Sequence, residues 1–145
     1  MEKAEKRILV VDDDDAIRAL LLTILRRRGF AVDIARNGAE AVERLARCNY
    51  AVMLLDMMMP VMNGWEVLER LAQHEPATRP VVIVLTAGNE PRDLKPELVS
   101  GSVRKPFDVD LLLDSVAACV NALGARPQLP NCPTPDSDRK DNQKT

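Results

Sequence analysis

Polar side chains of complementary chemistry stand at the ends of four apolar segments. The segments and their endings are, in chain order, residues 8–11 with Asp12 and Asp13, residues 51–55 with Asp56, residues 81–85 with Thr86, and the short stretch 102–104 with Lys105. The segments are continuous in apolar character, as parallel strands are when helices cover both faces of a sheet. Because ligands of such sheets bind at the carboxyl ends of the strands, we expect the four endings to meet there.

Three of these endings are carboxylates, which would repel one another unless a cation lay between them. Hard oxygen ligands with open coordination positions suit Mg²⁺. The residues therefore predict a metal, a hydroxyl and an amine around one carboxylate.

Helix signals separate the predicted strands. They are Asp14 and Asp15 as caps with Gly29 as a stop, Asn37-Gly38 before a second helix, Asn63-Gly64 before a third, and Asp108 before a last helix that ends at Gly124. Residues 30–34 alternate as a further strand. This order predicts a three-layer, doubly wound α/β domain with right-handed crossovers. Between Thr86 and Lys105, Pro91 and Pro96 predict that the fourth helix, within 88–100, is short or distorted.

The segments outside the alternating pattern differ in composition. We expect residues 1–6 to form an N-terminal extension, residues 7–124 to form the domain, and residues 125–145 to be a Pro-rich, disordered tail with almost nothing to bury. With 145 residues, 46% of them hydrophobic and 3% aromatic, the chain has room for one aliphatic core.

The charge balance excludes several classes of partner. The 20 basic and 22 acidic residues give a formal charge of −2, so neither nucleic acid nor a membrane surface is an expected partner. No apolar stretch approaches the roughly 20 residues that span a bilayer. Cys48, Cys119 and Cys132 lack the paired spacing of a zinc site, and we expect reduced thiols in a cytoplasmic protein.

Four sequence blocks resemble the response-regulator receiver domain of two-component signalling. They are residues 8–14 (ILVVDDD), 55–66 (LDMMMPVMNGWE), 85–87 (LTA) and 105–107 (KPF). The resemblance covers about residues 7–124 and implies a five-stranded parallel sheet in the flavodoxin-like order 2-1-3-4-5.

The resemblance also implies a role for each ending. Asp56 is the phosphoacceptor, which takes a phosphoryl group from a sensor histidine kinase or a histidine phosphotransfer protein. The residues implied to bind Mg²⁺ are Asp12, acting through water, Asp13, Asp56 and the backbone carbonyl of Met58. Lys105 binds a phosphoryl oxygen, and Thr86 donates its hydroxyl to another only after phosphorylation. The Lys105-Pro106 bond resembles the cis peptide of the family.

Two departures from the family affect the output. The family usually carries an aromatic residue three positions before the lysine, where this chain has Ser102, and the Pro-rich segment between Thr86 and Lys105 is shorter. Met58 and Gly88 occupy positions that help to orient the attacking water in the family, and neither side chain hydrogen-bonds it strongly. We therefore predict slow self-dephosphorylation.

The leading hypothesis is a stand-alone response regulator that signals by phosphorylation-dependent binding of an unknown downstream protein. Its enzymatic character is limited to its own phosphorylation and dephosphorylation. The alternatives are a phosphorylation-independent, receiver-like adaptor and a phosphorelay intermediate. A haloacid-dehalogenase-type hydrolase is disfavoured because Met58 stands where its second acid would be.

Overall fold

The computed structural model describes residues 4–87, 95–123, 126–127, 129–130 and 132. Its central sheet contains β2 (Arg7–Val11), β3 (Ala31–Ala35), β4 (Val52–Asp56), β5 (Val81–Thr86) and β6 (Gly101–Arg104). The helices are α1 (Asp15–Arg27), α2 (Gly38–Arg47), α3 (Gly64–Leu71) and α4 (Val109–Leu123), with a short 3-10 turn, η1 (Pro76–Thr78). Two further short strands, β1 (Ala4–Glu5) and β7 (Arg126–Pro127), lie outside the sheet.

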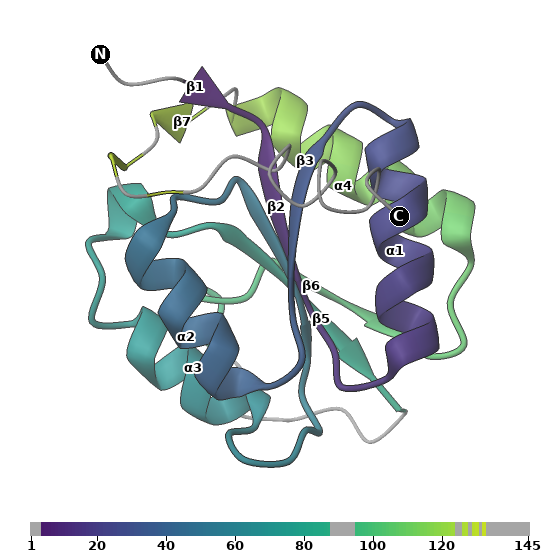
Figure 1. Ribbon diagram of the computed structural model, residues 1–145, viewed down its shortest axis with the longest axis horizontal. Helices are drawn as coiled ribbons and strands as arrows, with labels where there is room; N and C mark the ends of the chain where they lie inside the picture. Colours follow the sequence, from purple (N-terminus) through teal and green to yellow (C-terminus); the bar gives the residue numbers. More distant parts are fainter. Residues whose placement is uncertain (1–3, 88–94, 124–125, 128, 131, 133–145) are drawn as a thin grey trace, which may run out of the picture.

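All neighbouring strands of the five-stranded sheet are parallel, in the order β3-β2-β4-β5-β6. Without the short β1, this is the predicted order 2-1-3-4-5, and the doubly wound α/β architecture is confirmed. Helices α2 and α3 cover one face of the sheet, and α1 and α4 cover the other (Figure 1). The three layers bring the carboxyl ends of the strands to one edge of the molecule.

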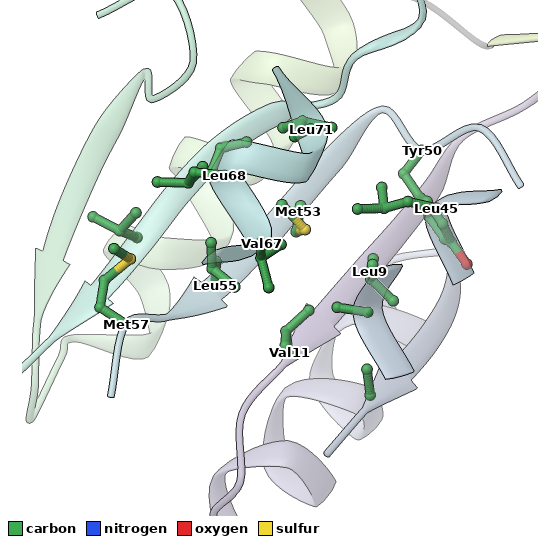
Figure 2. Packing of buried hydrophobic residues seen from close by; sticks show 14 of the residues in the cluster. Leu9, Val11, Leu45, Tyr50, Met53, Leu55, Met57, Val67, Leu68 and Leu71 are labelled. Atoms are coloured by element: carbon green, nitrogen blue, oxygen red, sulfur yellow. The ribbon is translucent and has the colours of Figure 1, made fainter. Parts of the chain in front are cut away.

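Alternate residues of each central strand supply the two hydrophobic cores. Leu9 and Val11 of β2 pack on the α2/α3 side, whereas Ile8 and Val10 pack on the α1/α4 side. Figure 2 shows Val67, Leu68 and Leu71 of α3 lying over the strands of the first core. Every residue of β2 and of β4 is buried, which explains their continuous apolar character.

Most helix boundaries follow the predicted local signals. Asp14 caps α1 by accepting hydrogen bonds from the backbone N–H groups of Ala16 and Ile17. Asn37 caps α2, and Asn63 forms a reciprocal capping box with Glu66 at α3. Gly29, at φ +90°, ends the α1 segment in a conformation that glycine adopts without strain.

The expected fourth helix falls partly on residues 88–94, which lie outside the described residues. Of the remainder, residues 96–98 form a turn, and the backbone N–H of Val99 donates to Lys95. Leu98 and Val99 pack against the core on the α2/α3 side. The structure passes directly from this turn into β6, so its α4 is the last helix of the predicted order.

The C-terminal segment differs from the sequence expectation. Residues 126–127 form β7, which pairs antiparallel with β1 from the N-terminal extension, and Cys132 forms a disulfide with Cys48. The prediction of reduced thiols is therefore wrong for two of the three cysteines. Residues 133–145 lie outside the described residues.

A buried polar cluster lies at the amino end of β2, between side chains of β2, β3 and the segment before β4. The Arg7 guanidinium binds the Asp33 carboxylate at 2.8 and 3.2 Å, and the Tyr50 hydroxyl donates to the same carboxylate at 2.7 Å. These partners compensate the cost of burying both charges.

Within the described ranges, no helix combines the length and the apolar character needed to cross a membrane.

Candidate functional site

Three aspartates meet at the carboxyl edge of the sheet. Asp12 and Asp13 follow β2, and Asp56 ends the neighbouring strand β4. Each of the three offers an oxygen, and these oxygens all lie within 4.8 Å of one another. Asp12 and Asp56 are buried, with exposed fractions of 0% and 5%, whereas Asp13 is exposed to solvent. The arrangement concentrates negative charge at one open position.

Lys105 places a cation against this cluster. Its Nζ lies 2.9 Å from Asp12 Oδ2 and 3.7 Å from Asp56 Oδ2. The backbone N–H of Lys105 donates to the carbonyl of Thr86 at 2.7 Å, and the Lys105-Pro106 peptide bond is cis. Burial disfavours the ammonium, but the hydrogen bond to Asp12 and the surrounding carboxylate charges outweigh it, so the pKa of Lys105 is raised.

The carboxyl group of Asp56 has an unusual affinity for protons. Burial is the main cause that raises its pKa, from an ordinary value of 3.8 to about 6, and the nearby charge of Asp12 acts in the same direction. The backbone N–H of Met58, 3.1 Å from Asp56 Oδ1, and the Lys105 ammonium oppose this rise in pKa. A cation bound among the carboxylates would favour the ionised form.

Thr86, at the end of β5, presents a buried hydroxyl without a protein partner. Its side chain is 3% exposed, and among the residues that the structure describes the hydroxyl oxygen has no hydrogen-bond partner. Buried hydroxyls normally have a hydrogen-bond partner, since a buried hydroxyl without one costs about 1–3 kcal/mol. This side chain is therefore suited to a ligand that arrives beside Lys105 and Asp56.

Arg18 is a part of the site that sequence reasoning missed. Its Nη1 donates to the backbone carbonyl of Asp12 at 2.9 Å, and its other terminal nitrogen pairs with Asp15. The contact joins helix α1 to the turn that carries the acidic residues. The spacing of Asp15 and Arg18 was an available signal, since residues three apart face each other on a helix.

The loop from Met57 to Asn63 is held against the start of α2. The backbone N–H of Gly38 donates to Met62 O at 3.0 Å, and a Cβ added at Gly38 would lie 2.3 Å from that oxygen. Val61 has a positive φ of 70°, although its side chain is β-branched. Met53, Met57 and Met59 are buried in the core, whereas the Met58 side chain is 67% exposed.

The arrangement has counterparts in known proteins. A profile described as the response regulator receiver domain matches residues 8–117, which contain the five-stranded sheet except Arg7 and all the residues of the carboxylate site. The chain belongs to the response regulator receiver family. Receiver domains are phosphoacceptor switches that histidine kinases phosphorylate, rather than conventional enzymes.

Two curated relatives of this receiver domain are longer proteins. The chain is 36% identical over 133 residues to the uncharacterized transcriptional regulatory protein YkoG of Bacillus subtilis, covering 87% of this chain and 55% of that protein. It is 41% identical over 103 residues to the transcriptional regulatory protein SrrA of Staphylococcus aureus, covering 69% of this chain and 42% of that protein. The chain thus spans about half the length of the curated relatives it matches.

Solved receiver structures share the fold. The response regulator TrrA of Thermotoga maritima, solved in complex with Mg²⁺ and BeF, is 36% identical with a TM-score of 0.70, covering 79% of this chain and 98% of that chain. The receiver domain of the Francisella response regulator 1452 is 26% identical with a TM-score of 0.73, covering 82% of this chain and 99% of that chain. Residues 7–123 of the receiver domain described here contain the corresponding strands and helices.

Proposed function

We propose that Asp56 accepts a phosphoryl group and that the receiver domain, residues 7–124, switches between two states as a result. The observation that carries this proposal is the position of Asp56, a buried carboxylate that lies beside two other carboxylates and within 3.7 Å of the Lys105 ammonium. The phosphodonor is a sensor histidine kinase or a histidine phosphotransfer protein.

The proposed transfer is a displacement at phosphorus. An Asp56 carboxylate oxygen attacks the phosphorus of a phosphohistidine, the P–O bond forms as the P–N bond breaks, and the donor imidazole leaves with the bonding electrons. Lys105 binds a phosphoryl oxygen and neutralises charge on the transferring group. Asp56 attacks as an ionised carboxylate. The burial that raises its pKa disfavours this form.

The donor set fits Mg²⁺, since it is made entirely of oxygen atoms and leaves open positions. Asp12 through water, Asp13, Asp56 and the Met58 carbonyl would hold the ion. When bound, Mg²⁺ would offset the charge that spreads over the phosphoryl oxygens during transfer. The clustering of the three carboxylates within 4.8 Å and the Mg²⁺ complex of the related TrrA support this assignment.

Thr86 couples the modification to the rest of the domain. Its hydroxyl, which has no partner among the described residues, would donate to a phosphoryl oxygen on Asp56. This bond would exist only in the phosphorylated state, so it favours one of two conformations of the end of β5. Its carbonyl accepts from the Lys105 N–H, which extends the coupling to β6.

We propose that the surface that binds the downstream protein acts without the aromatic side chain that the family usually carries on β6. Ser102 is exposed on β6, opposite Val84 of β5, where the family usually carries an aromatic side chain. We infer a cytoplasmic protein that binds a downstream protein in its phosphorylated form, without direct contact to nucleic acid. A phosphorylation-independent adaptor would bind that partner equally well with Asp56→Asn, and a relay intermediate would pass the phosphoryl group to a histidine protein.

Self-dephosphorylation is the reaction in which water attacks the phosphorus of phospho-Asp56 and releases phosphate. The Met58 side chain is 67% exposed and offers the attacking water only a weak acceptor. Gly88, the other position that in the family helps to orient the attacking water, lies outside the described residues. We propose a phospho-form that persists well beyond seconds, and complete decay within seconds would contradict this proposal.

The proposal is tested by intact mass after incubation with acetyl phosphate, with and without Mg²⁺. One Mg²⁺-dependent phosphoryl adduct is expected for the wild type, and none for Asp56→Asn. Asp110→Asn, at an exposed position on α4, is the matched control and should be modified like the wild type. Failure of correctly folded wild type to form the adduct, with acetyl phosphate or a panel of kinases, would overturn the proposal.

A further inference from the structure

The disulfide between Cys48 and Cys132 joins two parts of the chain that are 84 residues apart. Cys48 follows the last residue of α2, and its side chain is 2% exposed. Cys132 lies in the C-terminal segment, is partly buried, and packs against the core on the α2/α3 side. The two Cα atoms are 4.9 Å apart, within the normal range of a disulfide.

Short contacts accompany this covalent bond in the C-terminal segment. Arg126–Pro127 pairs with Ala4–Glu5 over two residues per strand, and the Cys132 N–H donates to Leu129 O at 3.1 Å. A pair of strands as short as this has little stability of its own. Of these contacts, the disulfide is best able to hold Cys132 and residues 126–127 and 129–130 on the domain.

The disulfide and the phosphoacceptor lie at opposite ends of β4. Cys48 precedes the strand at its amino end, and Asp56 is its last residue. The strand from Val52 to Asp56 alone spans roughly 13 Å at the usual rise per residue. A change at the disulfide can therefore alter the position of the C-terminal segment without touching the carboxylate site.

We propose that Cys48 and Cys132 form a reversible redox modification site, whose substrate is a dithiol reductant and whose opening releases Cys132 and residues 126–127 and 129–130 from the α2 end of the domain. The inference rests on the proposed cytoplasmic function, because disulfides in that compartment are mostly transient or regulatory. The receiver domain would then respond to two independent inputs, phosphoryl transfer at Asp56 and thiol exchange at Cys132.

Reduction of the disulfide proceeds in two displacement steps. A thiolate of the dithiol attacks the sulfur of Cys132, which is the less buried partner, and Cys48 leaves as a thiolate that takes a proton. The second thiol of the dithiol, as a thiolate, then attacks the other sulfur of the dithiol in the mixed disulfide, and Cys132 leaves as a thiolate that takes a proton. The dithiol loses two electrons and becomes a disulfide, and the protein gains two thiols.

Cys119 provides an internal reference. It is a free cysteine on α4, and burial raises its pKa. A thiol with a raised pKa exchanges slowly because less of it is thiolate. Because the disulfide occupies the other two cysteines, alkylation of the oxidised protein after rapid denaturation should label one cysteine, and alkylation after reduction should label three.

The test treats folded protein with dithiothreitol and follows two readouts, the number of alkylated cysteines by mass and amide hydrogen exchange by peptide. We expect three labelled cysteines, at least tenfold faster exchange in the peptides that contain Arg126 and Cys132, and unchanged exchange in β4. Oxidised dithiothreitol should restore the starting state. Cys132→Ser should show the fast exchange without reductant. Cys119→Ser should show the hydrogen exchange of the wild type, with no labelled cysteine when oxidised and two after reduction.

Either of two results would overturn the proposal. In one, the bond resists dithiothreitol until the protein unfolds, as a purely structural disulfide does. In the other, the bond opens but the peptides that contain Arg126 and Cys132 exchange no faster than before. Repeating the experiment with Asp56→Asn separates this site from the phosphoacceptor, since the redox response should be unchanged in a protein that cannot be phosphorylated.

Discussion

The Lys105 ammonium lies 2.9 Å from the carboxylate of Asp12, which is 0% exposed. A fully buried carboxylate without a partner is strongly destabilising, so this lysine supports the fold as well as the proposed chemistry. A side chain that we propose to bind a phosphoryl oxygen would then also have a measurable effect on the stability of the metal-free, unmodified domain.

Replacing Lys105 with methionine should lower the free energy of unfolding by about 2–4 kcal/mol at pH 7 without divalent metal, because the buried charge of Asp12 loses its cationic partner and keeps the backbone N–H of Asp14. Urea denaturation measures the change. Lys95→Met, at an exposed position in the turn before β6, is the matched control and should change stability by less than about 0.5 kcal/mol. Equal effects of the two substitutions would contradict the structural role of Lys105.

Replacing Asp56 with asparagine should stabilise the metal-free domain at pH 7. The pKa of Asp56 is raised in the folded state from 3.8 to about 6, so the folded state binds more protons than the unfolded state between these values. The contribution of Asp56 is therefore most favourable at acid pH and is lost as the pH rises through about 6. We expect Asp56→Asn to gain on the order of 2 kcal/mol at pH 7.

Denaturation curves of the two proteins between pH 4 and pH 8 check this prediction. The difference in stability should be small near pH 4 and should increase up to about pH 7. Glu69→Gln, an exposed change on α3, controls for the loss of one negative charge. A constant difference across the pH range would show that the pKa of Asp56 is not raised.

Val61 should be open to stabilisation by asparagine. Its φ of 70° is unfavourable for a β-branched side chain, and at 79% exposure the side chain buries little apolar surface. Asparagine adopts this conformation more readily, so Val61→Asn should raise the free energy of unfolding by about 1 kcal/mol. Val61→Ala, which keeps a Cβ and lacks the polar group, should gain less. A loss of melting temperature in Val61→Asn would refute the strain at this position.

Tyr50 should remain protonated for as long as the domain stays folded. Burial, followed by the charge of Asp33, raises its pKa above the ordinary value of 10.0. The folded state therefore holds the proton more tightly, and stability falls as the pH rises above 10. Since the chain has one tyrosine, tyrosinate absorbance should increase together with loss of the circular dichroism signal in an alkaline titration. Tyrosinate formation in folded protein would contradict this prediction.

Local signals account for the parts of the fold that were predicted correctly. Asp14, Asn37 and Asn63 cap helices through hydrogen bonds to residues two or three positions later, and Gly29 adopts a positive φ at the end of the α1 segment. These interactions depend on short stretches of sequence, so they can be recognised without knowing the fold. The prediction of a short or distorted helix within 88–100 also rested on a local signal, since proline cannot donate a backbone hydrogen bond, but residues 88–94 lie outside the described residues.

By itself, the sequence determined which chemical groups end the strands and that parallel strands would carry Asp12, Asp56, Thr86 and Lys105 to one edge, because a doubly wound sheet gathers its carboxyl ends there. Only the tertiary structure decided the distances between them and the contacts of residues far apart in the chain. These contacts include Arg7 with Asp33, Tyr50 with Asp33, and Cys48 with Cys132. Neither composition nor spacing predicts such pairs, because packing against the whole domain selects each partner from many of similar chemistry.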